Sequence, residues 1–222
     1  MLRGKDVFMQ HNERTTLILV RHGECAGNIE GRFRGRVDFP LNARGREQAA
    51  ACARAMVRLS PSVVYTSPLV RASDTASAIA AACSIPVVPE ERLNNMSLGE
   101  WENRKKDEIA REFPDQWNLW MQQPESLRVP GAETLDEVMR RSVECVNELV
   151  ARHRGDTIAV TSHRTVLKPM IAGLLGIRSP WFWKVHMDTA SISVILHEER
   201  RGYMIHRLND TSHLDSFETE WV

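Results

Sequence analysis

The fold of this chain is decided by the stretch Leu17-Ile18-Leu19-Val20-Arg21-His22-Gly23-Glu24, in which four apolar residues run directly into a cation, an imidazole and a glycine. An apolar run of this length predicts a strand buried in a sheet, here over Thr16–Val20. Such a strand delivers the groups that follow it to the rim of the sheet. His22 is therefore a candidate nucleophile, because a neutral imidazole carries a reactive lone pair.

The rest of the chain alternates between strand-like and helix-like patterns. Further strands are expected at Ser62–Thr66, Pro86–Val88, Thr157–Thr161, Ser191–Leu196 and Tyr203–Leu208. Helices are expected at Arg44–Leu59, with Asn42 as its N-cap, and at Leu69–Cys83, Lys105–Phe113, Glu133–Arg152 and Val166–Leu175. An irregular stretch containing Trp and Pro residues follows Phe113. This alternation predicts an α/β fold of three layers, α/β/α, around a mostly parallel sheet.

The domain prediction is a flexible leader over residues 1–14 and a single domain over residues 15–222, with an insertion or lid at residues 94–131. A chain of 222 residues is long enough for one sizeable α/β domain and short for two. The leader is polar and charged, which is not typical of a signal peptide. The four cysteines show no CxxC spacing, so without a disulfide framework the expected compartment is the cytoplasm.

The charges of the chain balance, with 29 Lys and Arg against 29 Asp and Glu. No overall field draws the chain to nucleic acid or to an anionic membrane, and no run approaches the ~18 apolar residues of a membrane span. We therefore expect neither partner. A homodimer is the expected assembly, because dimers are the commonest closed oligomers. Any bound anion has to be held by a local cluster of cations.

Three of the predicted strands lead into groups suited to one anion. The first ends at Arg21 and His22, and the second leads into a helix whose first turn carries Arg71. The strand near residue 160 ends at His163. Because ligands bind beyond the carboxyl ends of parallel strands, these four side chains are expected to converge on one edge of the sheet. Guanidinium groups bind phosphate oxygens with two N–H groups at once, which favours a phosphorylated ligand.

The order of these segments resembles the histidine phosphatase (phosphoglycerate mutase-like) superfamily, in particular bacterial phosphatases of its branch 1. The matching blocks are Leu19-Val20-Arg21-His22-Gly23-Glu24 with Asn28, Arg32-Phe33-x-Gly35, Ser67-Pro68-Leu69-x-Arg71-Ala72-x-x-Thr75-Ala76, Gly131-Ala132-Glu133-Thr134 and Thr161-Ser162-His163. The resemblance runs from about residue 16 to residue 214. The first block alone is common, whereas the ordered set is specific.

The resemblance implies a phosphatase that hydrolyses a small phosphorylated metabolite, a phosphomonoester, through a phosphohistidine on His22. It also implies that Arg21, Arg71 and His163 hold the transferring phosphoryl group, and that neither a metal nor a cofactor takes part. Two alternatives stay open. One is a phosphotransferase of the phosphoglycerate mutase type, and the other is a phosphate-binding or regulatory protein of low activity.

One departure from the family pattern concerns the proton donor. The family usually carries a Glu that protonates the leaving oxygen, and Asn95 occupies its place in Arg92-Leu93-Asn94-Asn95-Met96-Ser97-Leu98-Gly99-Glu100-Trp101-Glu102. An amide cannot act as a general acid. Glu100 or Glu102 could reach in from a shifted loop, the substrate could have a good leaving group, or the protein could be a slow phosphatase that mainly binds.

The candidates for substrate binding are Asn28, Arg34 and Arg164. Arg34 and Arg164 stand where relatives often carry Gln and Gly, so an arginine facing the pocket would favour a substrate with a second anionic group. Tryptophans in the second half of the chain are expected to pack under long loops, with Trp117 and Trp120 the best placed to shape specificity.

Overall fold

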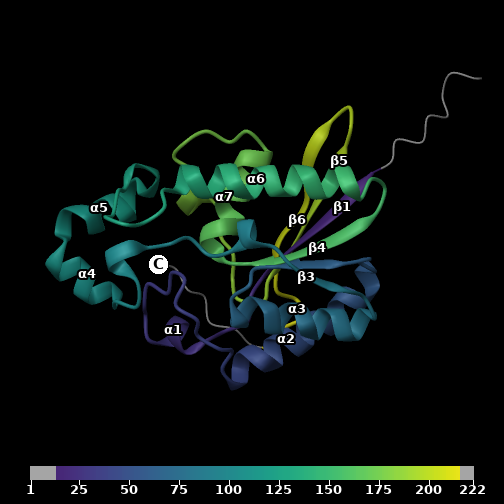
Figure 1. Cartoon of the computed structure of the whole chain (residues 1–222), viewed down its shortest axis with the longest axis horizontal. Helices are drawn as coiled ribbons and strands as arrows, with labels where there is room; N and C mark the ends of the chain where they lie inside the picture. Colours follow the sequence, from purple (N-terminus) through teal and green to yellow (C-terminus); the bar gives the residue numbers. More distant parts are fainter. Residues whose placement is uncertain (1–13, 216–222) are drawn as a thin grey trace, which may run out of the picture.

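The computed structural model describes residues 14–215 of the chain, and its centre is one six-stranded sheet (Figure 1). The strands are β1 (Thr15–Arg21), β2 (Val64–Thr66), β3 (Val87–Pro89), β4 (Thr157–Ser162), β5 (Ile192–Glu198) and β6 (Gly202–Asp210), arranged in the order β3-β2-β4-β1-β5-β6. The four strands β3, β2, β4 and β1 are parallel, and β5 and β6 continue the sheet antiparallel. The predicted mostly parallel α/β sheet is confirmed.

Helices cover both faces of the sheet and extend beyond one end of it (Figure 1). The α-helices are α1 (Ala26–Ile29), α2 (Ala43–Met56), α3 (Val70–Cys83), α4 (Lys106–Glu112), α5 (Pro114–Gln122), α6 (Leu135–Arg152) and α7 (Arg164–Leu174). Short 3-10 turns are η1 (Val57–Leu59), η2 (Glu91–Leu93), η3 (Gly99–Trp101), η4 (Pro124–Ser126) and η5 (Phe182–Lys184). Within residues 14–215, no helix is long and apolar enough to cross a membrane.

The alternation of side chains along β1 divides the core between the two faces of the sheet. Leu17 and Leu19 belong to a hydrophobic cluster with α6 and α7, whereas Ile18 and Val20 belong to a second cluster with α2 and α3. All four side chains are fully buried. A strand covered on both faces is apolar at every position, which explains the continuous run from which the sequence predicted it.

The helix boundaries follow local capping chemistry. Asn42 is the N-cap of α2, as the sequence predicted, and its Oδ1 accepts the N–H of Gly45 at 2.7 Å. Thr134 caps α6, where the Thr134 hydroxyl and the Glu137 carboxylate each accept the other residue's backbone N–H. Such caps satisfy N–H groups that the first turn of a helix leaves without partners.

Residues 94–131 lie beyond the strand ends, where Figure 1 shows α4 and α5 beside the sheet. The prediction of an irregular stretch after Phe113 is wrong in part, because Pro114 begins α5 instead of preventing a helix. Proline is well tolerated at the first position of a helix, where its missing N–H costs nothing. The segment packs Trp101 and Trp120 into the same cluster as Leu17. Of the predicted leader, residues 1–13 lie outside the described residues.

The loop after β1 lies in direct backbone contact with the first turn of α2. A Cβ atom added at Gly45 would lie 1.9 Å from the carbonyl oxygen of Glu24, and one added at Gly23 would lie 2.5 Å from the carbonyl oxygen of Gly45. Both obstacles are backbone atoms, which cannot rotate away. Glycine at these positions therefore lets α2 approach the end of the strand that carries His22.

We predict that Gly45→Ala destabilises the fold by about 2 kcal/mol or more, because the new methyl group has to displace backbone. Gly173→Ala in α7 is the matched control, since its Cβ would meet only the side chains of Val143 and Met139. These two side chains can shift without moving the backbone, and alanine favours a helix over glycine by about 1 kcal/mol, so that control should cost about 1 kcal/mol or less. Urea unfolding of the two variants measures the difference, and equal losses would contradict the argument.

Candidate active site

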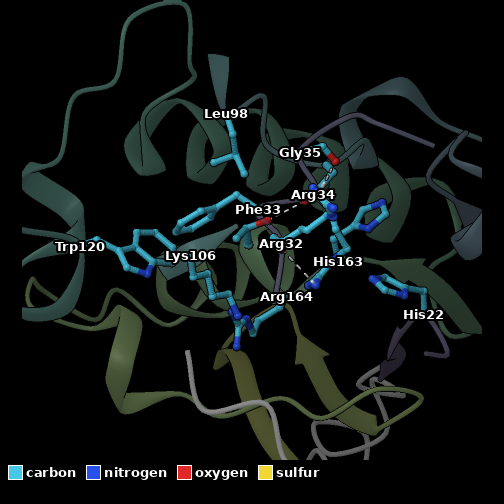
Figure 2. Close-up of a pocket in the computed structure, with 12 residues that line it drawn as sticks. His22, Arg32, Phe33, Arg34, Gly35, Leu98, Lys106, Trp120, His163 and Arg164 are labelled. Carbon is cyan, nitrogen blue, oxygen red and sulfur yellow. Dashed lines mark hydrogen bonds between the residues drawn. The ribbon is translucent and has the colours of Figure 1, made fainter. Parts of the chain in front are cut away.

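Two neighbouring parallel strands bring His22 and His163 side by side. Arg21 of β1 pairs with Ser162 of β4, and the N–H of His22 donates to the carbonyl of Ser162 at 3.0 Å. Each histidine follows directly on its strand, so their ring centroids lie 5.0 Å apart (Figure 2). Both side chains are almost completely buried. The structure thus brings together the two imidazoles that the sequence placed at strand ends.

The tautomer of His22 follows from its backbone contact. Its Nδ1 lies 2.7 Å from the carbonyl oxygen of Gly23, and a carbonyl can only accept a hydrogen bond. Nδ1 therefore carries the proton of the neutral ring, and the lone pair is on Nε2. Burial holds the pKa of His22 well below its usual value, with further lowering by the charges of Arg71, Arg21 and Arg34.

His163 is positioned by the strand β2. Its Nε2 lies 2.8 Å from the hydroxyl of Ser67, the residue that follows β2. Its Nδ1 is buried and has no hydrogen-bond partner among residues 14–215. Burial lowers the pKa of His163 well below its usual value, and the charge of Arg71 lowers it further. Both imidazoles are therefore neutral near pH 7.

Arg21 and Arg71 are fully buried cations that bind backbone carbonyls around the histidines. Arg21 Nη1 donates to the carbonyl of Met187 at 2.7 Å. Arg71 donates from Nη2 to Gly35 at 3.0 Å and from Nη1 to Val37 at 2.9 Å, while its Nε is buried without a partner in the described part of the chain. Both are close enough to affect His22 electrostatically, although neither is among the residues that line the pocket.

A pocket opens in front of the two histidines, and Figure 2 shows its lining side chains. Its walls are cationic on one part and apolar on another. The lining residues are His22, Arg32, Phe33, Arg34, Gly35, Asn95, Leu98, Lys106, Trp120, His163, Arg164 and Thr165. The predicted binding residues Arg34 and Arg164 are both present. No sequence pattern marked Arg32 or Lys106 as a binding residue, and an isolated β-bridge between Arg32 and Lys105 brings their two segments together.

Asn28 lies outside this lining and has a local role in α1. Its Oδ1 accepts hydrogen bonds from the N–H and the thiol of Cys25, at 3.1 and 3.0 Å. Trp120 lines the pocket, as its predicted role in shaping specificity requires, whereas Trp117 packs against the core cluster beside Phe33.

The structure does not bring Glu100 or Glu102 to the pocket lining. Glu102 Oε1 accepts the N–H groups of Arg36 and Leu98, each at 3.1 Å, so its carboxylate ties two loops together. Glu100 is exposed to solvent. Asn95, in contrast, does line the pocket and is 6% exposed.

Comparisons with known proteins agree with this arrangement. A model of the histidine phosphatase superfamily (branch 1) matches residues 17–211. Phosphoserine phosphatase 1 of Hydrogenobacter thermophilus is 36% identical over 204 residues, 92% of this chain and 96% of that protein. A metal-independent phosphoserine phosphatase of Arabidopsis thaliana is 31% identical over 216 residues, 96% of this chain and 88% of that protein.

Among solved structures, YhfR of Bacillus stearothermophilus is similar to this chain with a TM-score of 0.85 and 31% identity, over 90% of this chain and 98% of that one. A phosphoserine phosphatase of Entamoeba histolytica, solved in complex with phosphoserine, has a TM-score of 0.80 and 25% identity, over 90% of this chain and 99% of that one. The architecture around the two histidines is therefore that of a group of phosphatases.

The lowered pKa values predict a pH-dependent stability. In the unfolded chain His22 takes up a proton as the pH falls through about 6.5, whereas the folded chain resists protonation, so the free energy of unfolding falls with pH. Between pH 7.5 and 5.5, His22 accounts for roughly 1 kcal/mol of that fall. Urea unfolding at pH 7.5 and pH 5.5 should show that the free energy of unfolding falls less in His22→Gln than in the wild type, by this amount. An identical fall in both proteins would contradict the neutral state of the folded imidazole.

Proposed function

The chain belongs to the histidine phosphatase superfamily (branch 1), and on that premise we propose that it hydrolyses a small phosphorylated metabolite through a phosphohistidine formed on His22. The observation that carries the proposal is the state of that imidazole. Its proton is fixed on Nδ1 by the Gly23 carbonyl, which leaves the Nε2 lone pair available for attack on phosphorus. Burial and neighbouring cations keep the ring neutral, so the nucleophile is ready at ordinary pH.

The groups around His22 suit the charge of a transferring phosphoryl group. Arg21 and Arg71 supply buried positive charge, and two buried nitrogen atoms without partners in the described residues, Arg71 Nε and His163 Nδ1, are suited to bind phosphoryl oxygens. Ser67 Oγ accepts the N–H of Leu69 at 3.3 Å, so its hydroxyl proton is suited to donate to Nε2 of His163, which places the proton of the ring on Nδ1. Phosphoryl transfer depends mainly on such fixed donors, which act without reorganisation. No step of this scheme needs a metal ion.

The proposed hydrolysis has two steps. His22 Nε2 forms a bond to phosphorus while the bond from phosphorus to the leaving oxygen breaks. Water then attacks phosphorus, the electron pair of the N–P bond returns to the imidazole, and inorganic phosphate leaves. A mutase of the phosphoglycerate mutase type would instead return the phosphoryl group to another hydroxyl, so release of free phosphate separates the two reactions.

We predict that His22→Ala abolishes phosphate release from p-nitrophenyl phosphate and from phosphorylated metabolites. The wild-type protein, quenched in alkali during turnover, should contain an acid-labile phosphohistidine detectable by ³¹P NMR. His206→Ala is the matched control, because His206 is exposed on β6 and remote from the lining residues. Full activity in His22→Ala would refute the proposed nucleophile.

We also propose that the substrate carries a second anionic group, held by the cations of the pocket. Arg34 and Arg164 line the pocket, as do Arg32 and Lys106. Arg32 is already paired with Glu30, but the other three cations add to Arg21 and Arg71, and together they exceed what one phosphoryl group beside His22 requires. A second phosphate or a carboxylate on the substrate would neutralise part of this charge, because guanidinium groups pair well with both.

Arg34→Gln should therefore raise KM about tenfold for phosphates that carry a second anion, which corresponds to the loss of one charge-assisted hydrogen bond. KM for p-nitrophenyl phosphate should change much less. Arg54→Gln removes the same charge from the exposed face of α2 and serves as the control. A polyanionic substrate whose KM is equal in Arg34→Gln and Arg54→Gln would rule out this use of Arg34.

The remaining expectations on assembly and location are also proposals. A homodimer accords with the general preference for closed symmetric assemblies, and size-exclusion chromatography with light scattering tests it. The cytoplasmic location is proposed on the four scattered cysteines, which show no disulfide framework. The single domain over residues 15–222, with its insertion at residues 94–131, is proposed on the shared core cluster that joins Trp120 to Leu17.

A further inference from the structure

The described residues that line the pocket carry no carboxylic acid. Among the described residues that line it, the side chains next to the histidines are cationic, apolar, hydroxyl or amide groups, with no Asp or Glu. Hydrolysis of an alkyl phosphate ordinarily needs a proton for the leaving alkoxide, and a positioned acid contributes about 10²–10⁴-fold to such a step. The identity of the leaving group therefore depends on whether any lining residue can supply that proton.

Asn95 occupies the wall with both ends of its amide engaged. Its Oδ1 accepts the hydroxyl of Thr165 at 2.6 Å, and its Nδ2 donates to the carbonyl of Gly35 at 2.7 Å. Its backbone carbonyl is fixed as well, by Arg36 at 3.1 Å and by Arg141 at 3.3 Å. An amide N–H is far too weak an acid to give up its proton, and the Thr165 hydroxyl directs its proton to Asn95 instead of into the pocket.

The nearest acidic side chains serve the scaffold. Glu102 lies against Gly35, where an added Cβ would come within 2.5 Å of its Oε1, and it accepts two backbone N–H groups. Glu133 accepts hydrogen bonds from Arg141 and Arg36 and from the N–H of Ser97. Either carboxylate would have to abandon these bonds to reach a substrate.

The other ionisable groups of the lining are poor acids. His22 and His163 are neutral, because burial lowers the pKa of both well below the usual value. Arginine does not release a proton in proteins. An ammonium group is in general a much weaker acid than a carboxylic acid, so Lys106 is a poor replacement for the missing Glu.

We propose that the substrate of this protein is a phosphate whose leaving group departs as a resonance-stabilised oxyanion, that is, an acyl, enol or aryl phosphate. This inference rests on the proposed function of His22. As the N–P bond forms, the P–O bond breaks and its electron pair stays on the leaving oxygen, which takes no proton from the protein. The product leaves as a carboxylate, enolate or phenolate, and the second step with water is unchanged.

The pocket walls suit such a leaving group in two respects. Phe33, Leu98 and Trp120 form an apolar surface for a planar group, and the buried Nε1–H of Trp120 has no acceptor among residues 14–215. Arg34 and Arg164 supply positive charge where negative charge would develop on the departing oxygen. Fixed cations in a site that excludes water stabilise an oxyanion strongly, and they do so without proton transfer.

The test is a series of phosphate monoesters with leaving groups of graded acidity, from p-nitrophenyl phosphate through phenyl phosphate to alkyl phosphates. In the full-length wild-type protein, kcat/KM should fall steeply as the leaving group becomes more basic. Asn95→Glu introduces a proton donor, so it should raise the ratio of alkyl to aryl turnover about 10²-fold. Asn95→Gln is the matched control, because glutamine has the same side-chain length as glutamate but no acidic proton. This variant should keep the alkyl-to-aryl ratio of the wild type.

Three outcomes would overturn the inference. The first is an alkyl phosphate turned over as fast as p-nitrophenyl phosphate by the wild type, and the second is an equal change of the ratio in Asn95→Gln and Asn95→Glu. The third is a loss confined to alkyl phosphates in Lys106→Met, which would assign the acid to Lys106. His22→Ala, measured on p-nitrophenyl phosphate, separates the two proposals. If His22→Ala loses activity while kcat/KM of the wild type depends only weakly on the acidity of the leaving group, His22 remains the proposed nucleophile and only the leaving-group inference is wrong.

Discussion

The pocket depends on one constraint, the parallel register between β1 and β4. Pairing of Arg21 with Ser162 makes both strands end at the same level, and the N–H of His22 extends the ladder by a bond of 3.0 Å to the Ser162 carbonyl. Side chains alternate strictly along a strand, so a slip of one residue would turn one imidazole to the opposite face. It would also carry Arg21 toward the buried run. The register therefore holds the two imidazoles together, and the contrast between the apolar run and Arg21 at its end favours that register.

The chemical state of His22 follows from what packs around that strand end. The Gly23 carbonyl fixes the imidazole tautomer, and this loop can lie where it does because Gly45 in α2 has no side chain to oppose it. Arg71 reaches from α3 to the carbonyls of Gly35 and Val37 and so holds the loop that carries Arg34. The cation that lowers the pKa of the histidines thus also builds the pocket wall.

The sheet and the histidine pair could be predicted because each depends on local sequence. Buried strands appear as apolar runs, and a residue that follows such a run lies at the edge of the sheet. The path of residues 94–131 has no comparable signal, since Pro114 is compatible with both a loop and a helix start. Lys106 reaches the pocket because a bridge joins Arg32 to Lys105. Contacts between segments so far apart follow from packing, which no local pattern encodes.

The residues around His22 and the residues on the opposite wall of the pocket come from different parts of the chain. His22 and the cations near it, Arg21 and Arg71, lie at a strand end and in α3, where a shift in position would disturb the buried core. Asn95, Leu98, Lys106 and Trp120 instead come from residues 94–131, beyond the sheet. A substitution there alters the leaving-group side of the pocket while the register of β1 and β4 stays intact. Such segments on a rigid scaffold can change specificity independently of the shared chemistry. The amide at position 95 therefore bears on the proposed choice of substrate, whereas the proposed phosphoryl transfer to His22 depends on the sheet.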